Sequence, residues 1–156
     1  MNMKKQNDII DIDLTPTRKK RFRVDGDNDR ILELNVSDMG ILDRFNDVYP
    51  KLIELAEQGG AAFDFDDEAS TEEQIEHLGN AIKDVDTKMR KLMDKLFNAN
   101  VSEVCAPDGT MWDMFDGEFR FEHIIEALTP LYGSNISTEM DKVSKRIAKH
   151  TKKYTK

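Results

Sequence analysis

Hydrophobic and polar positions follow two different periods along this chain. Apolar side chains alternate with polar ones within residues 8–14, 20–24 and 31–36, which is the period of a β-strand. Turn-forming residues at 15–17 and 25–29 separate the three runs. The first 36 residues are therefore expected to form a small antiparallel sheet or a long hairpin. Two or three strands alone are marginal in water, so this sheet must pack on helices or pair with another chain.

From residue 37 onward the apolar positions recur every three or four residues, which predicts helices. Ser37 fits an N-cap, and the run that follows predicts a helix of about 20 residues that ends at Gln58, before Gly59-Gly60. Pro50 lies inside this run. A proline at such a position removes a backbone hydrogen bond and crowds the preceding turn. We expect a kink there, or two shorter helices.

The most regular pattern lies in residues 71–98. Ser70 and Glu73 fit a capping box at its start. Seven apolar residues then recur at alternating spacings of three and four over three heptads, as in a coiled-coil seam. Self-association into a homo-oligomer through this seam is one interpretation, and packing along one hydrophobic partner within the same domain is the other. This helix is expected to be the longest element. The seven residues are Ile75, Leu78, Ile82, Val85, Met89, Leu92 and Leu96.

The C-terminal third is expected to contain a compact connector and two helices. One helix is predicted from Glu118 to about Leu131, with Gly133 as its end. The last is predicted to begin near Ser134 or Ser137 and to fray after about His150. It is expected to pack on the rest of the protein through an apolar face. That face consists of Ile136, Met140, Val143 and Ile147.

These elements predict a mainly α fold with about four helices and a small N-terminal antiparallel β element; an α+β arrangement is the alternative. Three units are expected. They are an N-terminal β hairpin or extended arm (1–36), a helical core (37–133) and a basic C-terminal helix and tail (134–156).

Charge is distributed unevenly over these units. The chain of 156 residues has a net charge of −8. Residues 31–141 contain 25 acidic and eight basic residues, whereas residues 142–156 contain seven basic and no acidic ones. A basic helix end complements its own helix dipole, which is the first interpretation. Docking on an acidic protein surface comes second and nucleic-acid binding a distant third, because the acidic body would repel phosphates. The basic-tail residues singled out are Lys142, Lys145, Arg146 and Lys149.

Several classes of protein are excluded by composition. Cys105 is the single cysteine, so the chain has no intramolecular disulfide and no Cys-based zinc site. The three histidines are scattered, and the acidic run 25–29 lacks the Gly and Glu of a calcium-binding loop. No apolar run approaches the ~18 residues of a membrane helix, and no apolar segment follows the basic start. We expect an intracellular, cytoplasmic chain without a membrane contact.

The sequence contains no motif for nucleotide binding or hydrolysis, so neither an enzyme nor a cofactor or metal is expected. Instead, a cluster of apolar and aromatic residues joins the end of the long helix to the connector. Aromatic and Met residues suit partner recognition, which makes this cluster a candidate partner-binding surface. Its residues would equally suit the densest part of the core. They are Met89, Leu92, Met93, Leu96, Phe97, Trp112 and Phe115.

The order of these elements resembles the small tail-assembly chaperones of tailed phages (siphophages) that infect Gram-positive bacteria. The resemblance covers most of residues 30–156 and rests on the layout of the elements. Residues 1–25 are longer than expected for that family, so the resemblance assigns them no role. The similar stretches are Leu32–Val36 followed by Asp43–Val48, Lys91–Phe97, Phe115–Gly117, Phe121–Leu128 and the Lys-rich end from Lys142.

The resemblance implies a non-enzymatic assembly chaperone in the host cell cytoplasm. Such a protein binds the helices of the tape-measure protein and helps to recruit tail-tube subunits. One alternative is a structural subunit of a phage tail or particle that pairs through its N-terminal strands. Another alternative is an acidic regulator or inhibitor. The lysines interspersed along helix 71–98 argue against it, because they are typical of a solvated helix face.

Overall fold

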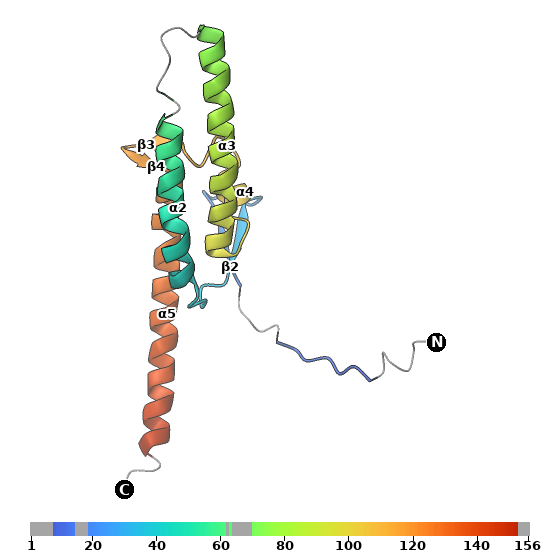
Figure 1. Ribbon diagram of the computed structural model, residues 1–156. Helices are drawn as coiled ribbons and strands as arrows, with labels where there is room; N and C mark the ends of the chain where they lie inside the picture. Colours follow the sequence, from blue (N-terminus) through green and yellow to red (C-terminus); the bar gives the residue numbers. More distant parts are fainter. Residues whose placement is uncertain (1–7, 15–18, 62, 64–69, 153–156) are drawn as a thin grey trace.

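The structure is a computed structural model that describes residues 8–14, 19–61, 63 and 70–152, the last three by their backbone alone. Within these residues the chain forms four helices and two small antiparallel sheets (Figure 1), which confirms the expected mainly α fold with a small N-terminal β element. The elements in order are β1 (Lys20–Arg23), β2 (Ile31–Leu34), α2 (Ile41–Ala61), α3 (Thr71–Phe97), α4 (Val101–Cys105), β3 (Met114–Phe115), β4 (Glu118–Phe119) and α5 (Arg120–Lys152).

Strands β1 and β2 form the predicted N-terminal hairpin, with Lys20 opposite Leu34. Leu32 and Leu34 face the core and are at most 1% exposed. Residues 8–14 carry the same alternation but have no strand partner among the described residues. Of the alternatives that the sequence left open, the structure thus shows the hairpin of two strands. An extended segment is stable as a strand only where a neighbour accepts its backbone hydrogen bonds and its apolar face.

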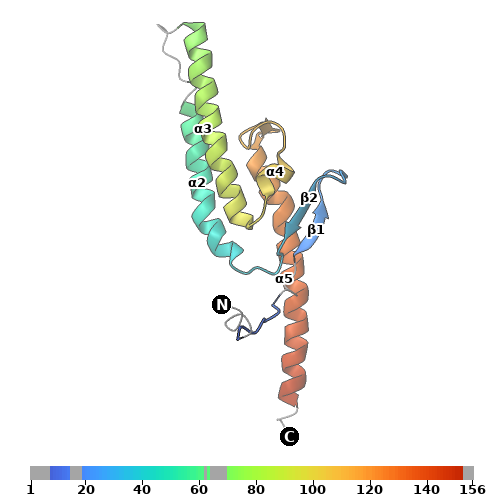
Figure 2. The ribbon, with the colours of Figure 1, turned by 90° about the vertical axis from the view of Figure 1, so that its right-hand side faces the viewer.

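Helices α2 and α3 lie side by side and antiparallel (Figure 2). Pro50 does not divide α2, which is one helix from Ile41 to Ala61. The proline is exposed, on the opposite side of the helix from buried Val48 and Leu52. The carbonyl that it leaves without a helical partner belongs to exposed Asn46, where water can satisfy it. A proline on the solvent side therefore leaves the packed face of this helix intact.

Helix α3 has the capping box that was predicted. The Ser70 hydroxyl accepts a hydrogen bond from the Glu73 amide at 3.2 Å, and the Glu73 carboxylate accepts one from the Ser70 amide at 3.4 Å. Asn98 ends the helix in the left-handed conformation, with φ of 50°. The helix is unbroken over 27 residues, but it is not the longest element, because α5 has 33.

Helix α5 runs from Arg120 to Lys152 without the predicted end at Gly133. The boundary drawn between residues 133 and 134 therefore falls inside a helix. Pro130 and Gly133 are both exposed, so the interruption of the backbone ladder faces water, as it does at Pro50. Gly133 stays in helical backbone, unlike Gly117, whose φ is 79° in the turn between β3 and β4.

The core lies between α2, α3, α4, β2 and the first half of α5. Two arginines hold the ends of helices against this core. Each donates a hydrogen bond to a backbone carbonyl that lacks a partner within its helix. Arg44 Nε donates to the Leu96 carbonyl at 2.9 Å, at the end of α3. Arg30 Nε donates to the Val104 carbonyl at 2.9 Å, at the end of α4. The largest fully buried side chains are Phe121, Leu32, Leu34, Leu52, Met89, Met93, Leu96 and Met111.

Candidate functional site

The candidate partner-binding cluster lies mostly in the core. Phe97 packs against Tyr132 of α5, with 6.0 Å between ring centroids. Trp112 lies between Phe63 and Phe119, at 5.5 and 6.1 Å. These side chains therefore pack within the fold, and Leu96 and Phe97 also form part of the lining of an open hollow that is described below. Met89, Met93, Leu96, Phe97 and Trp112 are buried, Leu92 is half-buried, and Phe115 alone is exposed.

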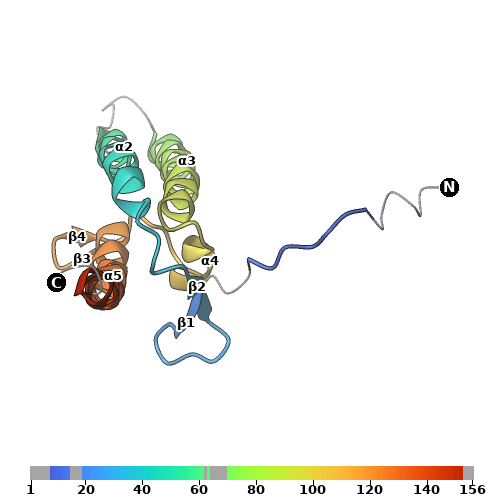
Figure 3. The ribbon, with the colours of Figure 1, turned by 90° about the horizontal axis from the view of Figure 1, so that it is seen from below.

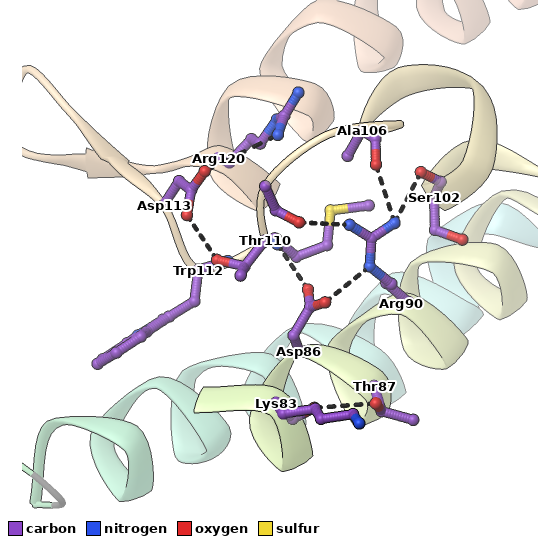
Figure 4. A network of polar contacts seen from close by, with 12 residues as sticks. Lys83, Asp86, Thr87, Arg90, Ser102, Ala106, Thr110, Trp112, Asp113 and Arg120 are labelled. Atoms are coloured by element: carbon purple, nitrogen blue, oxygen red, sulfur yellow. Dashed lines mark hydrogen bonds and ion pairs between the residues drawn. The ribbon is translucent and has the colours of Figure 1, made fainter. Parts of the chain in front are cut away.

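A polar network fixes the connector to α3 and explains this burial (Figure 4). The Arg90 guanidinium donates to the carbonyls of Ser102, Ala106 and Gly109 at 3.1, 2.9 and 3.0 Å. Its Nε also contacts the Asp86 carboxylate at 2.9 Å. The other oxygen of Asp86 accepts the Met111 amide at 2.7 Å. The connector is thus held as a wall of the core by hydrogen bonds to a charged pair, which are stronger than neutral ones.

This network was not predicted from the sequence. Asp86 and Arg90 have the spacing of an ordinary i,i+4 pair on a solvated helix face. One feature of the sequence could have indicated the network. Arg90 is the single arginine of α3, in which the other long basic side chains are lysines. Only arginine presents a planar fork that can bind several carbonyls at once.

Cys105 is a poor candidate for a nucleophile. Its thiol is half-buried, and burial raises its pKa to about 11. A thiol must lose its proton to act as a nucleophile. Cys105 instead packs against the core as a small, partly buried side chain.

One group of described residues has an arrangement that could hold a metal ion. Ligand atoms of Glu118, His123 and Glu126 all lie within 4.8 Å of one another. His123 Nδ1 is 3.5 Å from the Glu118 carboxylate, and its Nε2 is 3.2 Å from the Phe115 carbonyl. A direct contact between His123 and Glu118 accounts for the same geometry. No metal centre was expected from the sequence, and no motif in the sequence brings these three residues together.

An apolar groove opens where the start of α2, the end of α3 and the middle of α5 meet. It has a volume of about 370 Å³. Buried Phe97 and Tyr132 form part of its lining, whereas Met39 and Leu42 are 57% and 65% exposed. We call this hollow the groove. Its lining is almost entirely apolar and consists of Met39, Ile41, Leu42, Phe45, Leu96, Phe97, Thr129, Tyr132, Gly133 and Ile136.

The C-terminal half of α5 leaves the body of the protein (Figures 1 and 2). We call residues 136–152 the projection. Of the four residues that were expected to pack on the body, only Ile136 contacts the core. Met140 and Ile147 are each 54% exposed and Val143 is half-buried. The expected packing is therefore wrong beyond Ile136, because α5 continues past the body instead of turning back.

The basic-tail residues lie on the projection and are all exposed. Lys142 pairs with Glu139 at 3.5 Å, and Lys145 pairs with Asp141 at 3.0 Å. Exposed pairs of this kind contribute little to stability. Arg146 and Lys149 lie beside them on the same helix.

Comparison of the chain with protein-family models, with curated proteins and with solved structures finds no match. Similarity therefore assigns neither a family nor an activity. Within the described residues, none of the helices has the length and apolar character needed to cross a membrane.

Proposed function

We propose that this chain is a non-enzymatic assembly adaptor that holds an apolar helix of another protein in the groove. The observation that carries the proposal is the groove itself, an apolar hollow lined by three helices with exposed Met39 and Leu42 in its lining. Grooves of this kind accept the apolar face of an amphipathic helix. A Met side chain adapts to irregular apolar surfaces, which suits a chaperone that binds several turns of a partner.

Charge near the groove favours a partner helix with basic flanks. Asp43 follows Leu42 on α2 and is exposed. The net charge of −8 adds a weak attraction for a basic segment.

The resemblance to tail-assembly chaperones supplies the particular partner. On this proposal the chain covers apolar helices of a tape-measure protein in the host cytoplasm and brings tail-tube subunits to them. The chain needs no metal or cofactor for this role. An assembly factor of this kind is present in the lysate and missing from finished particles, whereas a structural subunit would be found in both by mass spectrometry.

Co-expression with the tape-measure protein of the same genome tests the groove. Leu42→Asp places a charge in the groove and should abolish the soluble complex. Ile75→Asp is the matched control, because Ile75 is 66% exposed but lies near the far end of α3. Both variants should keep the far-UV CD spectrum and melting temperature of the wild type. Absence of a complex with the wild type, or equal loss in both variants, would refute the proposal.

A further inference from the structure

Two carboxylates and an imidazole meet where the β3–β4 hairpin joins α5. Glu118 lies in β4, whereas His123 and Glu126 lie three residues apart on α5 and therefore on one side of that helix. Glu118 and His123 are half-buried and Glu126 is exposed. The hairpin lies beside α5 at the edge of the molecule (Figures 1 and 3), so an ion from solvent can reach these side chains. We call the three residues the hairpin site.

The two carboxylates of the hairpin site have no lysine or arginine to balance them. Within the part of the chain that the structure describes, neither Glu118 nor Glu126 forms an ion pair with either residue type. Arg120 is near in sequence, but its guanidinium contacts the Asp108 carbonyl and the Asp113 carboxylate of the connector. The hairpin site therefore has an excess of negative charge that a cation would neutralise.

One carboxylate oxygen of the hairpin site is buried without a hydrogen bond. Glu118 Oε2 accepts none from the described residues, and a buried charged group is normally paired or bound to a metal. His123 Nδ1 is 3.5 Å from this oxygen, which is longer than an ordinary hydrogen bond of ~2.7–3.2 Å. Two ligand atoms on one tetrahedral ion with bonds of ~2.1 Å are about 3.4 Å apart. The separation thus suits two ligands of a shared ion better than a direct hydrogen bond.

The turn of the hairpin orients the imidazole for this role. His123 Nε2 is 3.2 Å from the Phe115 carbonyl. A carbonyl can only accept, so Nε2 carries a hydrogen and the neutral ring has its lone pair on Nδ1. The Phe115 ring also contacts the imidazole edge-on, with 6.2 Å between centroids. Histidines that bind metals commonly donate their other ring N–H to a carbonyl or carboxylate, and Phe115 supplies that acceptor here.

We propose that Glu118, His123 and Glu126 bind one divalent transition-metal ion, through His123 Nδ1 and one oxygen of each carboxylate. Imidazole with carboxylates suits Zn²⁺ and its first-row neighbours, whereas Ca²⁺ and Mg²⁺ take oxygen ligands. Three protein ligands leave a position for water. Atoms bound to one ion at ~2.1 Å are at most about 4.2 Å apart. The ligand atoms already lie within 4.8 Å of one another, so a small inward rotation of the exposed Glu126 side chain completes the site.

The bound ion ties the hairpin to α5. Strands β3 and β4 pair through two residues each, Met114 with Phe119 and Phe115 with Glu118, and so short a ladder is marginal by itself. The hairpin site shares no residue with the groove. Metal binding is therefore a property separate from the capture of a partner helix, and either can be present without the other.

Titration of the full chain with ZnCl₂ tests the proposal. The protein carries no affinity tag, and EDTA is removed by dialysis before isothermal calorimetry. The wild type should bind one Zn²⁺ per chain and no Ca²⁺. His123→Ala should abolish the binding, and Glu126→Gln should weaken it at least about tenfold. His77→Ala is the matched control, because His77 is exposed on α3, away from the hairpin, and it should bind like the wild type.

Far-UV CD shows whether each variant keeps its fold, and Glu126→Gln, at an exposed position, serves as the test if His123→Ala does not fold. The absorption bands of Co²⁺ provide a second readout, since they should report a bound imidazole in the wild type and in His77→Ala but not in His123→Ala. A wild type that binds no Zn²⁺ would overturn the proposal. Equal losses in His123→Ala and His77→Ala would also overturn it, as would Ca²⁺ binding as tight as that of Zn²⁺.

Discussion

The two halves of α5 have the same apolar spacing and opposite environments. Phe121 and Tyr132 in the first half are 0% and 3% exposed, whereas Met140 and Ile147 in the second half are 54% exposed. The first half contributes to the core, whereas the second half has left the body (Figure 2). Helical periodicity therefore shows that a face requires a partner, but it does not show whether that partner belongs to the same chain.

A matched pair of Met substitutions provides the largest contrast between the two environments. Met93 is 0% exposed in α3 and Met140 is 54% exposed on the projection. Met93→Asp buries a charge without a partner, which should cost several kcal/mol and unfold a domain of ordinary stability. Met140→Asp should change the free energy of unfolding by less than ~0.5 kcal/mol. Urea unfolding followed by far-UV CD at low micromolar concentration measures both. Equal destabilisation would show that the projection also packs on the body.

The Arg90 network should give the next largest effect. Arg90→Met keeps the length of the side chain but leaves three carbonyls and the Asp86 carboxylate without their donor. Removal of one partner from such a part-buried charged pair should cost about 3–5 kcal/mol. Lys88→Met is the control, because Lys88 forms an exposed i,i+4 pair with Asp84, which contributes less than ~1 kcal/mol. Similar losses in the two variants would mean that the connector does not depend on Arg90.

The smallest expected effect is the pH dependence of stability that arises from Asp38, which lies just before α2 and beside the groove. A hydrogen bond from Arg44, at 2.6 Å, holds the pKa of the Asp38 carboxyl below its usual value of 3.8. Partial desolvation opposes this effect and the Gly40 amide adds to it. A lowered pKa adds stability that is present above the unfolded-state value, about 3.9, and is lost as the pH falls through the folded-state value.

Asp38→Asn should therefore lower the melting temperature by a constant amount above about pH 5. The difference from the wild type should shrink below about pH 4, where the wild-type carboxylate takes up its proton. Melting curves between pH 7 and pH 2.5 provide the measurement. A difference that stays the same down to pH 2.5 would show that the carboxylate charge does not contribute.

Local chemistry accounts for the features that the sequence predicted correctly. The capping box at Ser70, the alternation in β2 and the long apolar repeat of α3 each involve neighbouring residues only. The Ser70 and Glu73 side chains accept hydrogen bonds from backbone amides at the start of α3, and both residues can be recognised from this short stretch of sequence alone. Signals of this kind predict the type of an element and one of its ends.

Features that depend on the orientation of an element were not predictable. Pro50 and Gly133 were expected to interrupt helices, but both sit within helices whose packed faces lie elsewhere. The cluster around Met93 was compatible with a surface or a core, and only the position of the connector decides between them. The groove combines residues from three helices, so no single stretch of sequence contains it.

Gly59 determines how closely the indole of Trp112 approaches α2. A methyl group at this position would lie 3.1 Å from the indole ring. Trp112 is the single tryptophan of the chain, is 6% exposed, and lies at the junction of α2, the connector and β4. The protein thus contains its own fluorescent reporter. Its emission reports whether these parts of the body remain assembled, and it stays unchanged when only the distant projection gains or loses a neighbour.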